Sequence, residues 1–150
     1  MKSYLYPALL LAGCAGTPVH YDVANVRGPY GSPGTHETHR GGSCDAKLRI
    51  RVIDAQHAPV AGARVVVYRQ VRAQAIEENL GTDEYRTHPV LTDARGFAHV
   101  CSPDDLPPQS RWEGIGGGFT IRGTAQLDVF DDRGRTATTS EPFAAQIVLR

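Results

Sequence analysis

The chain has 150 residues, 41% of them hydrophobic, and its 16 basic and 16 acidic side chains cancel to a formal net charge of zero. This length suits a single globular domain. Because neither sign of charge is in excess, the composition does not favour nucleic-acid binding, and we expect no nucleic-acid partner.

The N-terminus carries a short apolar run, Ser3 to Ala12, after a single basic residue, Lys2. A helix that spans a bilayer needs roughly 20 apolar residues, so this run is too short to remain in the membrane. A basic start, an apolar run and small residues at the cleavage point are the layout of a secretory signal. We therefore predict that residues 1–13 form a signal peptide.

The end of this segment, Leu11-Ala12-Gly13-Cys14, resembles the bacterial lipobox. The resemblance implies that Cys14 is lipidated and becomes the first mature residue, with the lipid bilayer as its partner through N-terminal acyl chains. Stable attachment needs more than one chain, and the family places several on one cysteine. Ala15 stands where inner-membrane retention would favour Asp, which implies the periplasmic face of the outer membrane. The alternative is an ordinary signal peptide followed by an incidental cysteine.

The segment 14–43 has the composition of a loop, with five Gly and two Pro within 27–43. It shows no hydrophobic period, so we predict a flexible tether over 14–43 with an end-to-end distance of roughly 30 Å. His36, Glu37 and His39 are residue types that bind divalent metals, but a flexible chain does not preorganise them. We therefore expect no metal site.

After this segment the pattern is that of short strands. Leu48, Ile50 and Val52 alternate with arginines, a period of two that indicates a strand with one buried face. Strand patterns occur over 46–54, 63–71, 96–101, 119–130 and 143–150. The segment 71–80 is the best helical candidate. Several short strands separated by turn residues predict an all-β sandwich of about seven strands over 44–150.

Two turns carry Asp at their first position and Gly at their fourth, Asp93 to Gly96 and Asp131 to Gly134. Those positions of a type I turn favour these residues. We therefore predict that each turn closes a hairpin. Gly62 is expected to adopt a positive φ or to allow a close approach of the backbone.

The stretches 52–69 (VIDAQHAPVAGARVVVYR) and 91–100 (LTDARGFAHV) contain an Asp-led turn, Pro-hydrophobic-x-Gly-Ala, a β-branched strand and Thr-Asp-x-x-Gly-aromatic. This pattern resembles the carboxypeptidase regulatory-like domain, which implies a transthyretin-like or immunoglobulin-like β-sandwich. His57 stands where that family usually has Gly, and His tolerates a positive φ better than most residues. The fold is shared by domains with unrelated functions, so it says little about chemistry. The matching residues are Asp54, Pro59, Val60, Gly62, Ala63, Val65, Thr92, Asp93, Gly96 and Phe97.

Two cysteines remain once Cys14 is assigned to lipid. Cys44 precedes the first strand of the expected sandwich, and Cys101 ends the strand that follows the Asp93 turn. A secretory signal delivers the chain to an oxidising compartment, where disulfides form. We predict a bond between Cys44 and Cys101, which chain-entropy arguments value at roughly 4 kcal/mol as an upper figure. Two free thiols are the alternative.

Several transthyretin-like proteins are enzymes, and their motifs differ from those of this chain. The hydrolase branch ends in Tyr-Arg-Gly-Ser, whereas this chain ends in AAQIVLR. Intradiol dioxygenases bind iron through two Tyr and two His, but the histidines at 57, 88 and 99 lack a closely spaced pair. We therefore expect no enzymatic activity, no catalytic residue and no cofactor.

Together these observations predict a non-catalytic lipoprotein of the bacterial envelope that binds a partner or supports structure there. We expect contacts to an envelope protein through the segments 70–90 and 103–118. One alternative is a carbohydrate- or peptidoglycan-binding module that uses Trp112 as an aromatic platform, although a covering core position suits this residue better. Another is the sandwich lipoprotein that anchors type VI secretion machines, which shares size, anchor and architecture with this chain.

Overall fold

The computed structural model describes residues 16–27, 36–75, 79–106 and 119–150. These ranges contain ten strands and one 3₁₀ turn, η1 (Pro103–Asp105). The strands are β1 (Pro18–Arg27), β2 (His36–Asp45), β3 (Leu48–Ile53), β4 (Arg64–Ala75), β5 (Asn79–Thr87), β6 (Val90–Leu91), β7 (Phe97–Val100), β8 (Phe119–Phe130), β9 (Thr136–Ser140) and β10 (Gln146–Val148).

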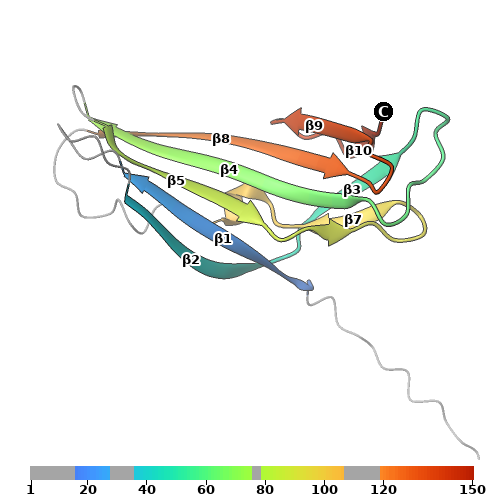
Figure 1. The fold of residues 1–150 in the computed structure, drawn as a ribbon, viewed down its shortest axis with the longest axis horizontal. Helices are drawn as coiled ribbons and strands as arrows, with labels where there is room; N and C mark the ends of the chain where they lie inside the picture. Colours follow the sequence, from blue (N-terminus) through green and yellow to red (C-terminus); the bar gives the residue numbers. More distant parts are fainter. Residues whose placement is uncertain (1–15, 28–35, 76–78, 107–118) are drawn as a thin grey trace, which may run out of the picture.

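The strands form two sheets. The seven-stranded sheet has the order β2-β1-β5-β4-β8-β9, with β6 also paired to β4, and the three-stranded sheet has the order β10-β3-β7. Figure 1 shows the three-stranded sheet at one end of the long strands β4, β5 and β8. The predicted all-β sandwich is confirmed, with more strands than the seven expected. Within the described ranges no helix is long and apolar enough to cross a bilayer.

The core lies between the two sheets and is built from the residues of each strand whose side chains face the other sheet. Val65 and Val67 on β4 are fully buried, and so are Ile50 and Val52 on β3. Branched side chains of this kind fit the pleated, buried surface of a sheet. Burial of one of them contributes roughly 1.5–3 kcal/mol, which makes this face the main source of stability.

The structure corrects the expected tether over 16–27 and 36–43; the rest of the predicted tether, 14–15 and 28–35, lies outside the described residues. Residues 18–27 and 36–45 pair as the antiparallel strands β1 and β2, and β1 also pairs with β5. Val19, Tyr21 and Val23 alternate along β1 and are all buried. This period of two is present in the sequence and is the signal that indicates a strand there.

Gly42 on β2 has a packing role that the loop-like composition of the sequence around it does not indicate. A Cβ atom on Gly42 would lie 2.5 Å from the hydroxyl oxygen of Tyr21, because the Tyr21 ring occupies that space. The same ring approaches Tyr85, with 6.1 Å between ring centroids. Gly42 therefore admits an aromatic side chain to the inner face of the sheet, which is a known use of glycine inside a strand.

The structure also corrects the helical candidate at 71–80. β4 continues to Ala75, β5 begins at Asn79, and β4 pairs with β8 along its whole length. Helix propensities differ by only a few tenths of a kcal/mol per residue, so pairing on both edges of β4 outweighs them. The segment 70–90, expected to form loops for a partner, consists mainly of this hairpin.

The predicted disulfide between Cys44 and Cys101 is present, with the two Cα atoms 6.0 Å apart. Cys44 lies in β2 of the seven-stranded sheet, and Cys101 directly follows β7 of the three-stranded sheet. The bond therefore links the two sheets. Cys101 is fully buried, so the link lies inside the core.

Replacing both Cys44 and Cys101 with Ser should lower the free energy of unfolding by up to roughly 4 kcal/mol, because the unfolded chain loses a long covalent loop. Equilibrium urea unfolding measures the difference. The wild-type protein in excess reductant is the control and should unfold at the same urea concentration as the double variant. Equal stability of the oxidised, reduced and substituted proteins would contradict a stabilising bond.

Candidate functional site

The predicted site residues divide into those that the structure describes and those that it does not. Cys14 and Trp112 lie outside the described residues, so the lipidation and the aromatic platform stay predictions. Of the segment 103–118, only 103–106 is described. The predicted turn residues all lie in loops: Asp54, Pro59 and Gly62 between β3 and β4, and Asp93 and Gly96 between β6 and β7.

Three loops share one geometry, and each begins with an aspartate: Asp54, Asp93 and Asp131. In each loop Oδ1 accepts hydrogen bonds from the backbone N–H groups two and four residues later, at 2.8–3.0 Å. The fourth residue of each loop has a positive φ, which is 63° at His57, 82° at Gly96 and 80° at Gly134. An Asp side chain that satisfies the donors of its own turn explains why Asp leads each loop. These carboxylates are therefore structural.

The two turns predicted to be hairpins connect different kinds of strand pair. The Asp131 turn joins β8 to β9, which pair with each other, and so confirms the prediction. The Asp93 turn joins β6 of the seven-stranded sheet to β7 of the three-stranded sheet, which corrects it. The Gly96 carbonyl accepts a hydrogen bond from the Val52 N–H at 2.7 Å, so this turn is fastened to β3, the neighbour of β7 in the three-stranded sheet.

Thr92 connects the two stretches that carry the family resemblance. Its buried hydroxyl donates to the Val60 carbonyl at 2.6 Å and accepts a hydrogen bond from the Ala63 N–H at 2.9 Å. The Thr92 N–H in turn donates to the Ala63 carbonyl at 2.9 Å. The motif residues therefore meet in space, and their contacts support the fold.

A groove of about 450 Å³ lies where the start of β1 faces β7. Its lining includes three histidines, His20, His88 and His99, and Leu91, whose side chain is 60% exposed. The rings of His20 and His88 have centroids 6.1 Å apart, and His88 Nε2 lies 3.3 Å from an Asp22 carboxylate oxygen. The groove is open, and its lining combines these histidines with apolar residues such as Val90 and Leu91.

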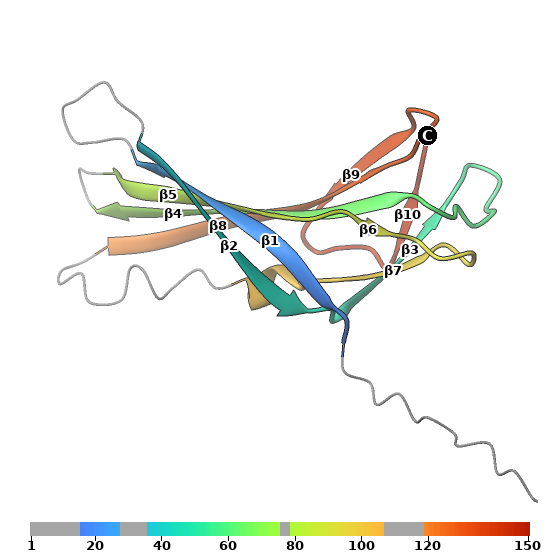
Figure 2. The same ribbon diagram turned by 60° about the horizontal axis from the view of Figure 1, so that its bottom comes forward.

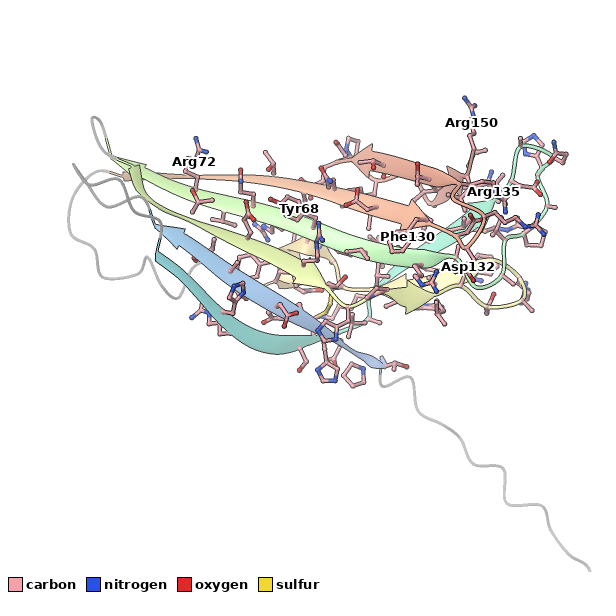
Figure 3. All side chains as sticks on the ribbon, in the orientation of Figure 1. Tyr68, Arg72, Phe130, Asp132, Arg135 and Arg150 are labelled. Atoms are coloured by element: carbon pink, nitrogen blue, oxygen red, sulfur yellow. A yellow bond between two sulfur atoms is a disulfide. The ribbon has the colours of Figure 1, made fainter. Side chains whose placement is uncertain are left out.

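The outer face of the seven-stranded sheet is polar. Figure 3 labels Tyr68 and Arg72 on β4, two residues of this face. Tyr68 borders a shallow hollow of about 280 Å³ together with Gln126. Partial burial, the neighbouring carboxylate of Glu84 and a hydrogen bond with that carboxylate raise the pKa of Tyr68, so its hydroxyl stays protonated and donates to Glu84.

The residues suggested by sequence as metal-binding types, His36, Glu37 and His39, all lie in β2. His39 is on β2 and exposed, while the side chains of His36 and Glu37 fall outside the description. Among the side chains that are described, no three His, Cys, Asp or Glu come together in a way that could hold a metal ion.

The fold and its loops define a class of protein, a disulfide-bonded all-β sandwich with Asp-led turns. No protein-family model, no curated protein and no solved structure matches the chain. The resemblance to the carboxypeptidase regulatory-like domain therefore rests on the motif residues of the loops described above.

Substitution of two loop glycines separates backbone strain from steric clash. Both have a positive φ, but a Cβ on Gly62 meets nothing within 4 Å, whereas one on Gly96 would lie 2.5 Å from the Val52 carbonyl oxygen. Gly62→Ala should cost about 1–2 kcal/mol through strain alone. Gly96→Ala should cost at least twice as much. Thermal or urea unfolding of the two variants measures this, and equal losses would show that the contact with Val52 is unimportant.

The Asp93 loop should contribute to acid sensitivity. Hydrogen bonds from the backbone N–H groups of Phe97 and Arg95, together with nearby guanidinium groups, hold the pKa of Asp93 below its usual value. A carboxyl whose folded pKa is lowered stabilises the fold above its unfolded pKa, near 3.9, and that contribution is lost as the pH falls toward the folded value. Asp93→Asn keeps an oxygen acceptor but cannot titrate. The variant should therefore lose less stability than the wild type between neutral pH and about pH 3, as measured by urea midpoints; identical losses would contradict this role.

Proposed function

We propose that this protein is a lipid-anchored, non-catalytic binding or structural module of the bacterial cell envelope, with Cys14 as its acylated residue. The lipobox-like sequence before Cys14 is the basis of the proposal. Three features of the described structure support it: the place where the fold begins, the use of the other cysteines, and the use of the motif carboxylates.

The observation that carries most weight is how soon the fold begins after Cys14. The Thr17 carbonyl accepts a hydrogen bond from the Ala46 N–H at 3.2 Å, and β1 starts at Pro18. Figure 2 shows the start of β1 beside the connection between β2 and β3. Because consecutive Cα atoms are 3.8 Å apart, the Cys14 Cα lies within about 11 Å of that of Thr17. An acyl group on Cys14 would thus hold the sandwich close to the bilayer.

The use of the cysteines agrees with an exported, lipidated chain. Cys44 and Cys101 are consumed by the disulfide, which is a bond typical of oxidising compartments. Cys14 is the one cysteine outside that bond. Lipidation would give this remaining thiol a chemical role.

The motif carboxylates support a non-catalytic role. The Oδ1 atoms of Asp54, Asp93 and Asp131 each accept two backbone hydrogen bonds, and the second oxygen of Asp131 also contacts the Arg135 guanidinium at 2.7 Å. Groups engaged in this way stabilise loops. They are poorly suited to accept a proton from a substrate.

Metabolic labelling with palmitate tests the anchor. The wild-type protein should take up the label and partition into the detergent phase of a phase-separating extraction, whereas Cys14→Ser should do neither. The Cys44→Ser/Cys101→Ser variant is the matched control, because it changes two cysteines and should keep the label. Absence of label from the wild type would overturn the proposal.

A further inference from the structure

Basic side chains gather on the outward-facing side of the three-stranded sheet. On β3, Arg49 and Arg51 face outward, while Ile50 between them is fully buried. β7 places His99 opposite Arg49 and Phe97 opposite Arg51. The residue before β3 and the loop before β7 add two more cations. We call this surface the basic face; it consists of Lys47, Arg49, Arg51, Arg95, Phe97 and His99.

Three guanidinium groups surround the ring of Phe97. The guanidinium carbon lies 3.8 Å from the ring centroid for Arg49, 5.5 Å for Arg95 and 5.6 Å for Arg51. Cations are attracted to the face of an aromatic ring, so Phe97 can hold like charges together without neutralising them. Within the described part of the chain, none of these three arginines forms an ion pair.

The acids that border the basic face are already engaged. Asp105 lies 3.4 Å from Lys47, whose side chain is 63% exposed. Asp93 uses Oδ1 to accept two backbone hydrogen bonds of its own loop. The charge of Asp93 acts on Arg95 and Arg49 and balances part of their charge. Arg49 and Arg95 are nevertheless exposed and form no ion pair with the residues that the structure describes, so they can meet an outside anion, and the half-buried Arg51 adds its charge beside them.

Two arginines elsewhere in the molecule neutralise nearby acids, unlike the three around Phe97. Arg64 pairs with Asp132, and Arg135 pairs with Asp131 at 2.7 Å. The chain as a whole is neutral. A neutral chain that leaves three clustered arginines unpaired has an uneven charge distribution, and such a field attracts an anionic surface.

The basic face lies beside the point where the chain enters the fold. Ala46, whose N–H donates to the Thr17 carbonyl, is followed directly by Lys47. The groove described above is lined by Thr17 together with Phe97 and His99 of the basic face. A membrane anchor at Cys14 would therefore hold this face, rather than the far ends of β4 and β5, next to the lipid head groups.

We propose that the basic face docks on anionic phospholipid head groups, so that the sandwich has a fixed orientation on the membrane. The docking rests on the proposed acylation of Cys14, which supplies the proximity. Arginine matches phosphate through paired N–H donors, and Phe97 offers an aromatic ring of the kind found at membrane interfaces. Acyl chains together with a basic surface form a two-part membrane attachment.

The acylation rate of the Lys47 amine measures docking, because Lys47 is the only lysine after Lys2. The lipidated protein is placed in vesicles of phosphatidylcholine, with or without phosphatidylglycerol, and treated with an amine-acylating reagent. Each basic residue near an anionic surface adds roughly a fivefold preference for the docked state, so two of them already predict about a 25-fold preference. Lys47 should therefore react at least about tenfold more slowly in the anionic vesicles. High salt should restore the reaction rate.

Charge reversal identifies the surface responsible. Arg49→Glu/Arg51→Glu should abolish the protection of Lys47. Arg95→Glu, a second variant on an exposed loop, should remove most of it. Arg72→Glu/Arg86→Glu reverses two charges on the other sheet and is the matched control; it should keep the protection. Loss of protection in the control as well would overturn the assignment to the basic face.

Proteolytic digestion and mass spectrometry of the treated protein separate the two proposals. The mass of the peptide that begins at Cys14 shows whether that residue is acylated. An acylated peptide with equal Lys47 reactivity in both kinds of vesicle would refute docking and leave the anchor intact. An unmodified Cys14 would refute the anchor and the docking together.

Discussion

The covalent bond between Cys44 and Cys101 is the constraint on which the arrangement of the molecule depends. It joins the end of β2 in one sheet to the end of β7 in the other, inside the core. The hairpin of β1 and β2 lies at the edge of the seven-stranded sheet, where pairing is available on one side only. The bond fixes that edge to the second sheet, and the buried Tyr21 ring covers Gly42 of the neighbouring strand.

The three Asp-led loops reverse the chain in the same way. Each must reverse the chain over few residues while its backbone donors stay satisfied, and in each the leading carboxylate accepts two of them. The variation lies in the fourth residue, which is His57 in one loop and glycine in the others. His57 shows that a positive φ can be met without glycine where the loop is exposed.

The regular part of the fold could be predicted from the sequence because its signals are local. Alternation around Ile50, and the Asp and Gly of the turns, are visible within a few residues. The hairpin of β1 and β2 was missed because glycine content outweighed the alternation of Val19, Tyr21 and Val23. The role of Gly42 depends on a ring from another strand, which no local pattern contains.

The basic face could be predicted only in part. The alternation of β3 places Arg49 and Arg51 on one side, but their meeting with Phe97 and Arg95 depends on the pairing of β3 with β7. A net charge of zero hides this grouping, because composition averages over surfaces that the fold separates. The proposed contact surface is therefore a product of topology rather than of any single motif.

The entry of the chain at β1 also determines how the molecule bears mechanical load. β1 lies between β2 and β5 and is antiparallel to both. A force that draws the first residues outward along the axis of β1 acts at right angles to the hydrogen bonds of both ladders, since those bonds run across the strands. The bonds then share the tension and must slide together instead of opening one after another. An attachment at this end would join the domain to its support in the direction in which a sheet resists pulling best.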